Sequence, residues 1–202
     1  FRVDLNPTSK SHLGKSTRNQ QNIPNQFINV NGKPILAYAL EAYQNHPAID
    51  DIYIVCLKGW DTIVWSYAHE FGIRKLRGIV SGGQYGVTSA KNAFDLLRNK
   101  YADEDIIIFQ ESTRPMITIE TISNLLMEAT RCNYAVICQS MKDYIQFKCD
   151  GDMTQYMNRN KVFDLQSPEA YKFKNLELVF EKAQKDSHTL NETCCSMLLY
   201  NL

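Results

Sequence analysis

The chain has 202 residues and a mass of 23.3 kDa, and its 22 lysines and arginines equal its 22 aspartates and glutamates. This length suits one domain with a continuous core that needs neither disulfides nor metals, so we expect residues 1–202 to form a single domain. The balanced charge excludes a global field that would hold nucleic acid or an anionic membrane. A polyanionic ligand must therefore be met by a local group of side chains.

The cysteines and histidines show no framework of disulfides or metal ligands. The six cysteines are Cys56, Cys132, Cys138, Cys149, Cys194 and Cys195. Adjacent cysteines cannot easily bridge each other and no Cys-x-x-Cys pair exists, so mostly buried, reduced thiols are expected. The four histidines lack metal-ligand spacing, which argues against a structural zinc. Without a run of roughly 20 apolar residues or a signal-peptide layout, the sequence predicts a cytoplasmic protein.

Residues 1–26 are polar, apart from one short apolar piece at the very start. Their richness in Asn, Gln, Ser, Thr and Lys predicts a loop or a poorly ordered arm. Within this arm, residues 14–18 (Gly-Lys-Ser-Thr-Arg) imitate the end of a P-loop. That motif needs a glycine five residues before Gly14, where Ser9 stands, so a Walker A site is excluded.

From Phe27 onward, helical stretches alternate with compact apolar runs. Helices are expected from Pro34 to about Gln44, over 61–71, after the glycines at 82–83, and over 118–131, where Thr118 can cap. Buried strands are expected at 51–57, ending at 79–80, at 105–109 and at 134–138. Four strand–helix units in a row imply a mostly parallel sheet with right-handed crossovers. The expected fold class is therefore α/β.

Beyond Met141 the alternation loosens. Short hairpin-like runs are expected at 143–148 and 161–165, and helices near 172–185 and 191–200. The basic and aromatic residues at 171–174 are interpreted as the solvated start of a helix, so no nucleic-acid partner is expected.

Ligands of an open α/β sheet bind beyond the carboxyl ends of its strands, and two segments there carry suitable groups. Residues 110–115 (Gln-Glu-Ser-Thr-Arg-Pro) follow the strand at 105–109 and bring a carboxylate, Glu111, and a guanidinium, Arg114. A carboxylate at a strand end can hold Mg²⁺, which in turn bridges phosphate oxygens. The alternative is an Arg–Glu pair that only fixes the loop.

The second segment is a glycine-rich turn, residues 81–86, that leads from a strand into a helix. Exposed backbone N–H groups and the helix dipole suit an anion or a base edge there, although such turns are also common without ligands. The chain contains no Gly-x-Ser-x-Gly elbow and no Cys/His nucleophile arrangement.

Several segments together form a recognisable series of motifs. They are Gly14 to Arg18, Pro24-Asn25-Gln26-Phe27, Gly32-Lys33-Pro34-Ile35-Leu36, Gly82-Gly83 with Ser89, Gln110 to Pro115, Asn158-Arg159-Asn160, and Gln166 to Tyr171. In order and spacing, residues 14–202 resemble the cytidylyltransferases that make CDP-methylerythritol. They resemble more closely the relatives that make CDP-ribitol for wall and capsular polymers.

This resemblance implies a Rossmann-like nucleotidyltransferase of the nucleotide-diphospho-sugar transferase type, with a small β-arm. It implies CTP and a polyol phosphate as substrates, Mg²⁺ as cofactor, and a homodimer formed through residues 141–165. The residues that it implicates are Arg18 and the loop glycine Gly14 at the triphosphate, Gly82, Gly83 and Ser89 at cytidine, Glu111 at metal or ribose, and Arg159 with Ser167 at the acceptor phosphate.

Four positions depart from the family pattern. Asn25 replaces a lysine, Ser16 replaces a loop glycine, Glu111 replaces an aspartate, and Gly86 stands where an arginine is common. In addition, residues 6–10 (Asn-Pro-Thr-Ser-Lys) stand where the family has its first strand. Losing a phosphate-contacting lysine costs on the order of 10²-fold in rate. Two alternatives therefore stay open: a degenerate nucleotide-binding, dimerisation or scaffolding module of a larger polysaccharide-synthesis protein, and a transferase that uses another nucleotide.

Overall fold

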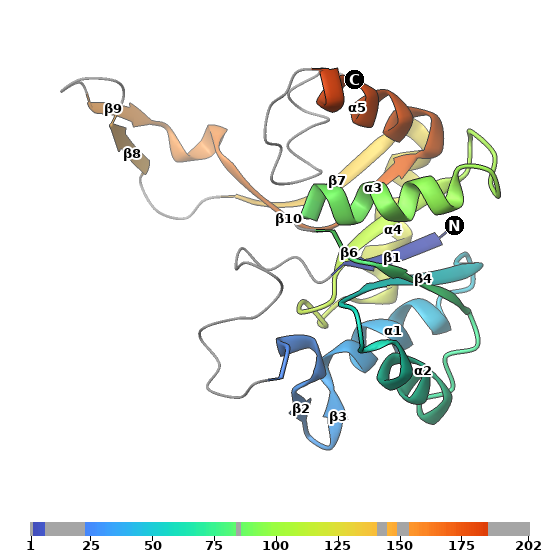
Figure 1. Cartoon of the computed structure of the whole chain (residues 1–202). Coiled ribbons are helices and arrows are strands. Elements are labelled where there is room, and N and C mark those ends of the chain that lie inside the picture. Colours follow the sequence, from blue (N-terminus) through green and yellow to red (C-terminus); the bar gives the residue numbers. More distant parts are fainter. Residues whose placement is uncertain (1, 7–22, 84–85, 141–144, 149–153, 186–202) are drawn as a thin grey trace.

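The structure, a computed structural model, describes residues 2–6, 23–83, 86–140, 145–148 and 154–185 (Figure 1). Its helices are α1 (Ile35–Asn45), α2 (Asp61–Glu70), α3 (Gly86–Leu97), α4 (Ile119–Cys132) and α5 (Phe173–Lys185), with short 3-10 turns η2 (Asn25–Phe27) and η3 (Arg159–Lys161). Its strands are β1 (Arg2–Asn6), β2 (Asn29–Val30), β3 (Lys33–Pro34), β4 (Asp51–Cys56), β5 (Leu76–Ser81), β6 (Ile106–Glu111), β7 (Tyr134–Ser140), β8 (Ile145–Lys148), β9 (Thr154–Met157) and β10 (Phe163–Lys172).

The central feature is a six-stranded sheet with the order β5-β4-β1-β6-β10-β7. The strands β5, β4, β1 and β6 run parallel to their neighbours, whereas β10 is antiparallel to both β6 and β7. The expectation of an α/β fold with a mostly parallel sheet is therefore confirmed. Ile52 and Ile54 of β4 face one core while Tyr53 between them faces the other, as the two-residue period of a doubly covered strand requires.

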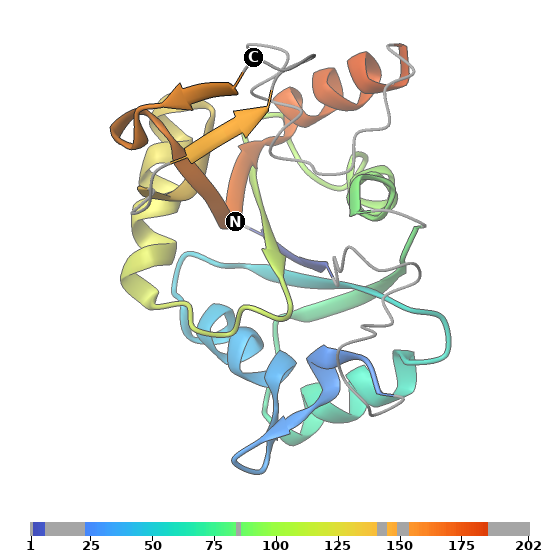
Figure 2. The ribbon, with the colours of Figure 1, turned by 90° about the vertical axis from the view of Figure 1, so that its left-hand side faces the viewer.

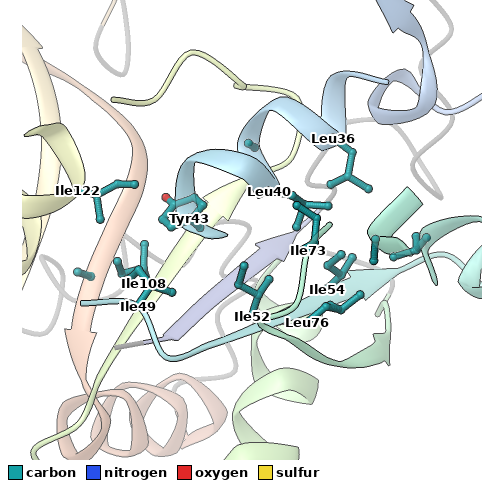
Figure 3. Packing of buried hydrophobic residues seen from close by; sticks show 14 of the residues in the cluster. Leu36, Leu40, Tyr43, Ile49, Ile52, Ile54, Ile73, Leu76, Ile108 and Ile122 are labelled. Atoms are coloured by element: carbon teal, nitrogen blue, oxygen red, sulfur yellow. The ribbon is translucent and has the colours of Figure 1, made fainter. Parts of the chain in front are cut away.

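Helices cover both faces of this sheet. Buried residues of α1, α2 and α4 form one core cluster, and those of α3 and α5 form another on the opposite face. Figure 1 shows α3 and α5 above the sheet, with α1 and α2 below it. In the first cluster, Tyr43 of α1 lies near Ile108 of β6 and Ile122 of α4 (Figure 3). All three side chains are fully buried, so this layer fixes α1 and α4 against the end of β6.

The expected helix boundaries are confirmed where local signals define them. Pro34 directly precedes α1, and the side chain of Thr118 caps α4 by accepting the backbone N–H of Thr121 at 3.1 Å. The left-handed backbone of Asn133, with φ of 70°, ends α4 and turns the chain into β7.

Two expectations for chain segments are wrong. Residues 2–6 form β1 in the middle of the sheet, paired with both β4 and β6, so the first strand is present and ends at Asn6. The run at 161–165 is not part of a hairpin with 143–148, because β8 pairs with β9, and Phe163 begins the long strand β10 of the main sheet. The pattern of β10 is hard to recognise because Pro168 lies inside it, at an irregularity between Gln166 and Glu169.

The expectation of mostly buried thiols is also wrong for the described cysteines. Cys56 is buried, but Cys132 at the end of α4 and Cys138 in β7 are exposed. β7 is an outer strand of the sheet, so its side chains are less covered than those of the inner strands. The expected helix at 191–200 lies outside the described residues.

The β8–β9 hairpin stands away from the six-stranded sheet as a small arm (Figure 1). Viewed after a quarter turn, the first part of β10 leads from this arm into the body (Figure 2). Among the helices that the structure describes, none is both long and apolar enough to cross a bilayer.

A buried histidine connects α1, α4 and the start of β5. His46 is 3% exposed, and its Nδ1 accepts the backbone N–H of Ala48 at 3.2 Å. Because a backbone amide can only donate, Nδ1 is unprotonated, and the Nε2 proton faces the Ser123 hydroxyl at 2.9 Å. Burial lowers the pKa of His46, and the nearby positive charge of Lys75 lowers this pKa further. The folded protein therefore holds His46 as the neutral imidazole.

This histidine should make stability depend on pH. Because its folded pKa lies below the ordinary value of about 6.5, the unfolded chain takes up the proton first as pH falls. Above about pH 7.5, we expect protonation of His46 to have no effect on the free energy of unfolding. As pH falls below about 6.5, this free energy should decrease. In His46→Asn, the amide oxygen can still accept the Ala48 N–H, and this decrease should become smaller. Urea unfolding between pH 5 and 8 measures it, and an unchanged decrease in the variant would contradict this role.

Candidate functional site

The carboxyl ends of the parallel strands meet at one edge of the sheet. At this edge β5 ends in the glycine turn after Ser81, and β6 ends in the turn after Glu111. β1 ends between them, with Asn6 in register with Glu111. Ligands of open α/β sheets bind at this edge, so the structure brings two of the expected site segments to the same side of the molecule.

Side chains of α3 shape the glycine turn from behind. The hydroxyl of Ser89, which is 5% exposed, accepts the backbone N–H of Gly83 at 2.9 Å. The side-chain amide of Asn92 donates to the carbonyl of Ser81 at 3.1 Å, and the N–H of Gly82 donates to the carbonyl of Cys56 at 2.9 Å. Three of the expected cytidine-site residues, Gly82, Gly83 and Ser89, are therefore together, with Ser89 organising the turn.

A tight turn at the end of β6 carries the expected carboxylate. The backbone N–H of Arg114 donates to the carbonyl of Glu111 at 3.0 Å, which closes the turn. Its guanidinium Nε donates to Glu111 Oε2 at 2.5 Å, and Nη1 donates to Oε1 of Gln166 in β10. The backbone N–H of Glu111 in turn donates to Ser167 Oγ at 2.7 Å. The Arg–Glu pair considered as the alternative is thus present, and it lies beside Ser167.

The segment that contains Asn25 is fixed to the same edge by aromatic stacking. Phe27, at the end of η2, stacks on Trp60 with ring centroids 4.4 Å apart and an interplanar angle of 7°. Trp60 lies just beyond the carboxyl end of β4. The ring of Tyr67 in α2 also contacts the Phe27 ring, in a tilted arrangement. Offset stacking of buried rings is worth about 0.5–1.5 kcal/mol beyond area burial. The stack therefore holds η2 near the strand ends.

A cavity of about 440 Å³ opens beside the Glu111–Arg114 turn. It lies between this turn, the start of α4, and the strands β7 and β10, and its lining includes Arg114, Ile117, Thr121, Ile137, Gln139 and Ser167. Among the residues that line it, Arg114 supplies the charge, and amide and hydroxyl groups supply hydrogen bonds. Ile117 and Ile137 are among the apolar residues that form the rest of the lining, so the cavity offers one cation and a few hydrogen-bonding groups to a small ligand.

Comparison with known proteins agrees with this geometry. Residues 12–196 match the protein family described as 2-C-methyl-D-erythritol 4-phosphate cytidylyltransferase. The chain belongs to this cytidylyltransferase family. It is 32% identical to a ribitol-5-phosphate cytidylyltransferase of Lacticaseibacillus paracasei, over 84% of this chain and 73% of the relative. It is 28% identical to the 2-C-methyl-D-erythritol 4-phosphate cytidylyltransferase of Clostridium acetobutylicum, over 86% of this chain and 75% of the relative.

Solved structures show the same fold. The 4-diphosphocytidyl-2C-methyl-D-erythritol synthase of Anaerococcus prevotii superposes with a TM-score of 0.79 at 16% identity, covering 99% of this chain and 82% of that one. The Francisella tularensis 2-C-methyl-D-erythritol 4-phosphate cytidylyltransferase gives a TM-score of 0.77 at 16% identity, covering 100% and 86%. The expected nucleotidyltransferase class and fold type are therefore confirmed for this member of the cytidylyltransferase family.

The structure describes only part of the expected site of this family. Gly14 and Arg18 lie outside the described residues, in the segment that follows β1. Arg159 lies in η3, before β10, and Ser167 lies well inside β10. The extended chain from Phe163 to Ser167 spans roughly 13 Å at about 3.3 Å per residue. No described contact joins Arg159 to Ser167, so their common assignment to the acceptor phosphate stays a prediction.

Two residues at the turn were not singled out from the sequence. Gln166 receives the Arg114 guanidinium and donates from its own amide to Asp164 Oδ2 at 2.6 Å. Gln110, the residue before Glu111, is 1% exposed and hydrogen-bonded on both sides of its amide. A glutamine inside the otherwise isoleucine-rich strand β6 is the signal that could have identified it.

The carboxylate donors suit a magnesium ion only in part. In the described part of the chain, no group of three or more His, Cys, Asp and Glu residues is placed to hold an ion. Mg²⁺ is commonly bound by one or two carboxylates together with substrate phosphates, so Glu111 alone provides a sufficient protein ligand. Arg114 already holds this carboxylate, and the ion would have to take its place.

Burial raises the pKa of Cys56 to about 11, so its thiol stays protonated and is no nucleophile.

Proposed function

We propose that this chain transfers CMP from CTP to a polyol phosphate such as ribitol 5-phosphate and releases pyrophosphate. The observation that carries the proposal is the 32% identity with a ribitol-5-phosphate cytidylyltransferase over 84% of the chain. The Arg114, Gln166 and Ser167 cluster beside an open cavity supports it, because this cluster offers a cation, an amide and a hydroxyl group to a phosphorylated acceptor. The product would be a cytoplasmic precursor for a cell-wall or capsular polymer.

In this reaction, an oxygen of the acceptor phosphate attacks the α-phosphorus of CTP in line. A new P–O bond forms as the bond between the α-phosphorus and the bridging oxygen breaks, and pyrophosphate leaves with that oxygen. We assign Gly82, Gly83 and Ser89 to the cytosine and ribose on the family resemblance, and the place of their turn at the carboxyl end of β5 supports this assignment. Arg114 and Ser167 face the acceptor cavity. Arg18 and Gly14 are assigned to the triphosphate on the family resemblance.

Glu111 is the residue that we assign to Mg²⁺. When bound, the ion would neutralise charge on the phosphates and orient them. The chain's own contribution is to place the carboxylate at the end of β6, where the Ser167 hydroxyl fixes its backbone N–H. Arg114 would then be released from Glu111 and could meet the acceptor phosphate, as guanidinium groups commonly do.

The direct test is pyrophosphate release from CTP and Mg²⁺ with ribitol 5-phosphate, methylerythritol 4-phosphate or glycerol 3-phosphate in turn. We expect release with ribitol 5-phosphate at least about tenfold faster than with the other two, since one unmatched polar group in a site designed for it costs more than 1.4 kcal/mol. Equal rates would contradict the assignment of the acceptor. Silence with all three acceptors would contradict the transferase function.

The substituted phosphate-site positions favour a second candidate, a nucleotide-binding or scaffolding module without turnover. Asn25 lacks the charge of the lysine that the family has there, and η2 holds it in place through the Phe27–Trp60 stack. Calorimetric titration with CTP, UTP, ATP and GTP distinguishes the candidates. Binding of CTP without pyrophosphate release supports the module, and preferential binding of another nucleotide supports a transferase of different specificity.

We also propose a homodimer that forms through the arm at residues 141–165. The β8–β9 hairpin stands away from the body, and Phe163 at the base of the arm is 53% exposed, as expected of a surface that a second copy covers. Light scattering at micromolar concentration should give about twice 23.3 kDa. Replacing residues 145–157 by a short glycine-serine linker should give the mass of one chain. A monomeric mass for the intact protein would contradict the proposal.

A further inference from the structure

The amide of Gln110 is placed where an apolar side chain would be expected. Ile106 and Ile108 of the same strand face the core formed with α1 and α4, and Gln110 continues this face with only 1% exposure. Burying an amide without hydrogen bonds destabilises a folded protein. The hydrogen-bond partners of Gln110 therefore indicate why a glutamine stands at this buried position.

These partners are the two ends of the site turn and one buried tyrosine. The Gln110 Nε2 donates to the carbonyl of Glu111 at 2.8 Å and to the carbonyl of Arg114 at 3.2 Å. Its Oε1 accepts the hydroxyl proton of Tyr43 at 2.9 Å. Because two carbonyls can only accept and the tyrosine donates, the orientation of the amide is fixed. Gln110 thus braces both ends of the turn from its inner side.

Tyr43 holds the glutamine from the middle of α1. Its side chain is completely buried against Ile108 and Ile122, as Figure 3 shows. Burial raises the pKa of Tyr43, so the hydroxyl keeps its proton and remains a donor. The Gln110 side chain therefore cannot rotate without leaving both the tyrosine hydroxyl and two backbone carbonyls unsatisfied.

We propose that Tyr43 and Gln110 are a positioning pair that sets the distance between the Glu111 carboxylate and the Arg114 guanidinium. Neither residue needs to touch a substrate, because they act through the backbone carbonyls at both ends of the turn. The kinetic consequence of this inference rests on the proposed function, whereas its structural consequence does not. Displacing catalytic groups by about 1 Å can cost as much as 10²-fold in rate.

The test removes the tyrosine hydroxyl by Tyr43→Phe and compares it with Tyr171→Phe. Tyr171 is a matched control, since it is 1% exposed and its hydroxyl bonds to Glu169 Oε2 at 2.6 Å, away from the turn. In Tyr43→Phe we expect the backbone amide of Arg114 to exchange with deuterium about tenfold faster, as measured by NMR. In Tyr171→Phe the exchange at Arg114 should be unchanged. This arm needs no activity, so it stands even where the transferase function fails.

The second arm measures kinetics. Tyr43→Phe should lower kcat roughly tenfold and change KM for CTP less than about twofold, because the glycine turn is untouched. Gln110→Leu should lower kcat at least as much, and adding Tyr43→Phe to it should cause no further loss. Gln110→His, which offers one acceptor and one donor nitrogen, should recover part of the rate. Unchanged exchange at Arg114, or additive losses in the double variant, would overturn the proposal.

Discussion

Glu111→Gln should lower the rate of pyrophosphate release by about 100-fold or more while leaving the protein folded. Glutamine keeps the shape of the side chain but removes the negative charge. A bound metal ion needs this charge as a ligand, and phosphoryl-type transfer depends mainly on electrostatic stabilisation of its transition state. The effect on stability should be small, because the partners Arg114 and Glu111 have side chains that are 44% and 32% exposed. Surface pairs of this kind contribute about 0–1 kcal/mol.

A second ion pair provides the control for this substitution. Arg131 and Glu128 in α4 have the same i,i+3 spacing, with 2.6 Å between Nη2 and Oε2. Glu128→Gln removes an equivalent surface pair far along the helix from the site turn, so it should match the stability change of Glu111→Gln and leave turnover unchanged. Pyrophosphate release and urea unfolding measure the two quantities. If both variants retain full activity, Glu111 has no part in the reaction.

Gly83→Ala should disrupt the glycine turn and weaken CTP binding at least about tenfold. A Cβ at this position would lie 2.2 Å from Oγ1, 2.7 Å from Cβ and 2.9 Å from the backbone carbon of Thr88. Rotating the threonine relieves the first overlap only, so the turn or the start of α3 must shift. Overpacking of this kind costs typically about 1–3 kcal/mol of stability. The shift would also loosen the hydrogen bond between the Gly83 N–H and Ser89.

Gly82→Ala separates this steric effect from the loss of a glycine as such. A Cβ at Gly82 would meet its nearest atoms at 3.5, 3.7 and 3.8 Å, which are ordinary contact distances. We therefore expect its midpoint of thermal unfolding to stay close to that of the unmodified protein, whereas Gly83→Ala lowers it by several degrees. Isothermal titration with CTP completes the comparison. Equal midpoints for the two variants would show that Thr88 can move away from the new Cβ without loss of stability.

The parts of the fold that the sequence predicts are those with local signals. Pro34 and Thr118 each stand directly before a segment whose apolar residues recur with helical spacing. These signals lie within a few residues of each other, so α1 and α4 were predictable. β1 was not, because Arg2–Asn6 is short and lacks the continuous apolar run typical of an inner parallel strand, and only pairing with β4 and β6 places this segment in the centre of the sheet. β10 was hidden in a similar way, since Pro168 interrupts its pattern.

The site follows the same division. Glu111 and the glycine turn were expected at the ligand-binding edge, because the carboxyl ends of parallel strands lie together by geometry. The contacts between Arg114 and Gln166 and between Gln110 and Tyr43 join residues 52 and 67 positions apart. Such pairs depend on the register of β10 against β6 and on how α1 lies on the sheet. Neither feature can be inferred from one sequence by local patterns. The positions of these segments in the fold were thus predictable, and the hydrogen-bond partners of single residues were not.

The central place of β1 also governs when the sheet can be completed. Arg2 pairs with Asp51 on one side and with Ile107 on the other. During synthesis the first strand therefore leaves the ribosome long before either neighbour exists, and parallel pairings over such distances form slowly. Until β6 emerges, β1 can pair with β4 on one side only, and its other edge remains an open template for other chains. The sheet is thus completed around its first strand only when β6 has been made.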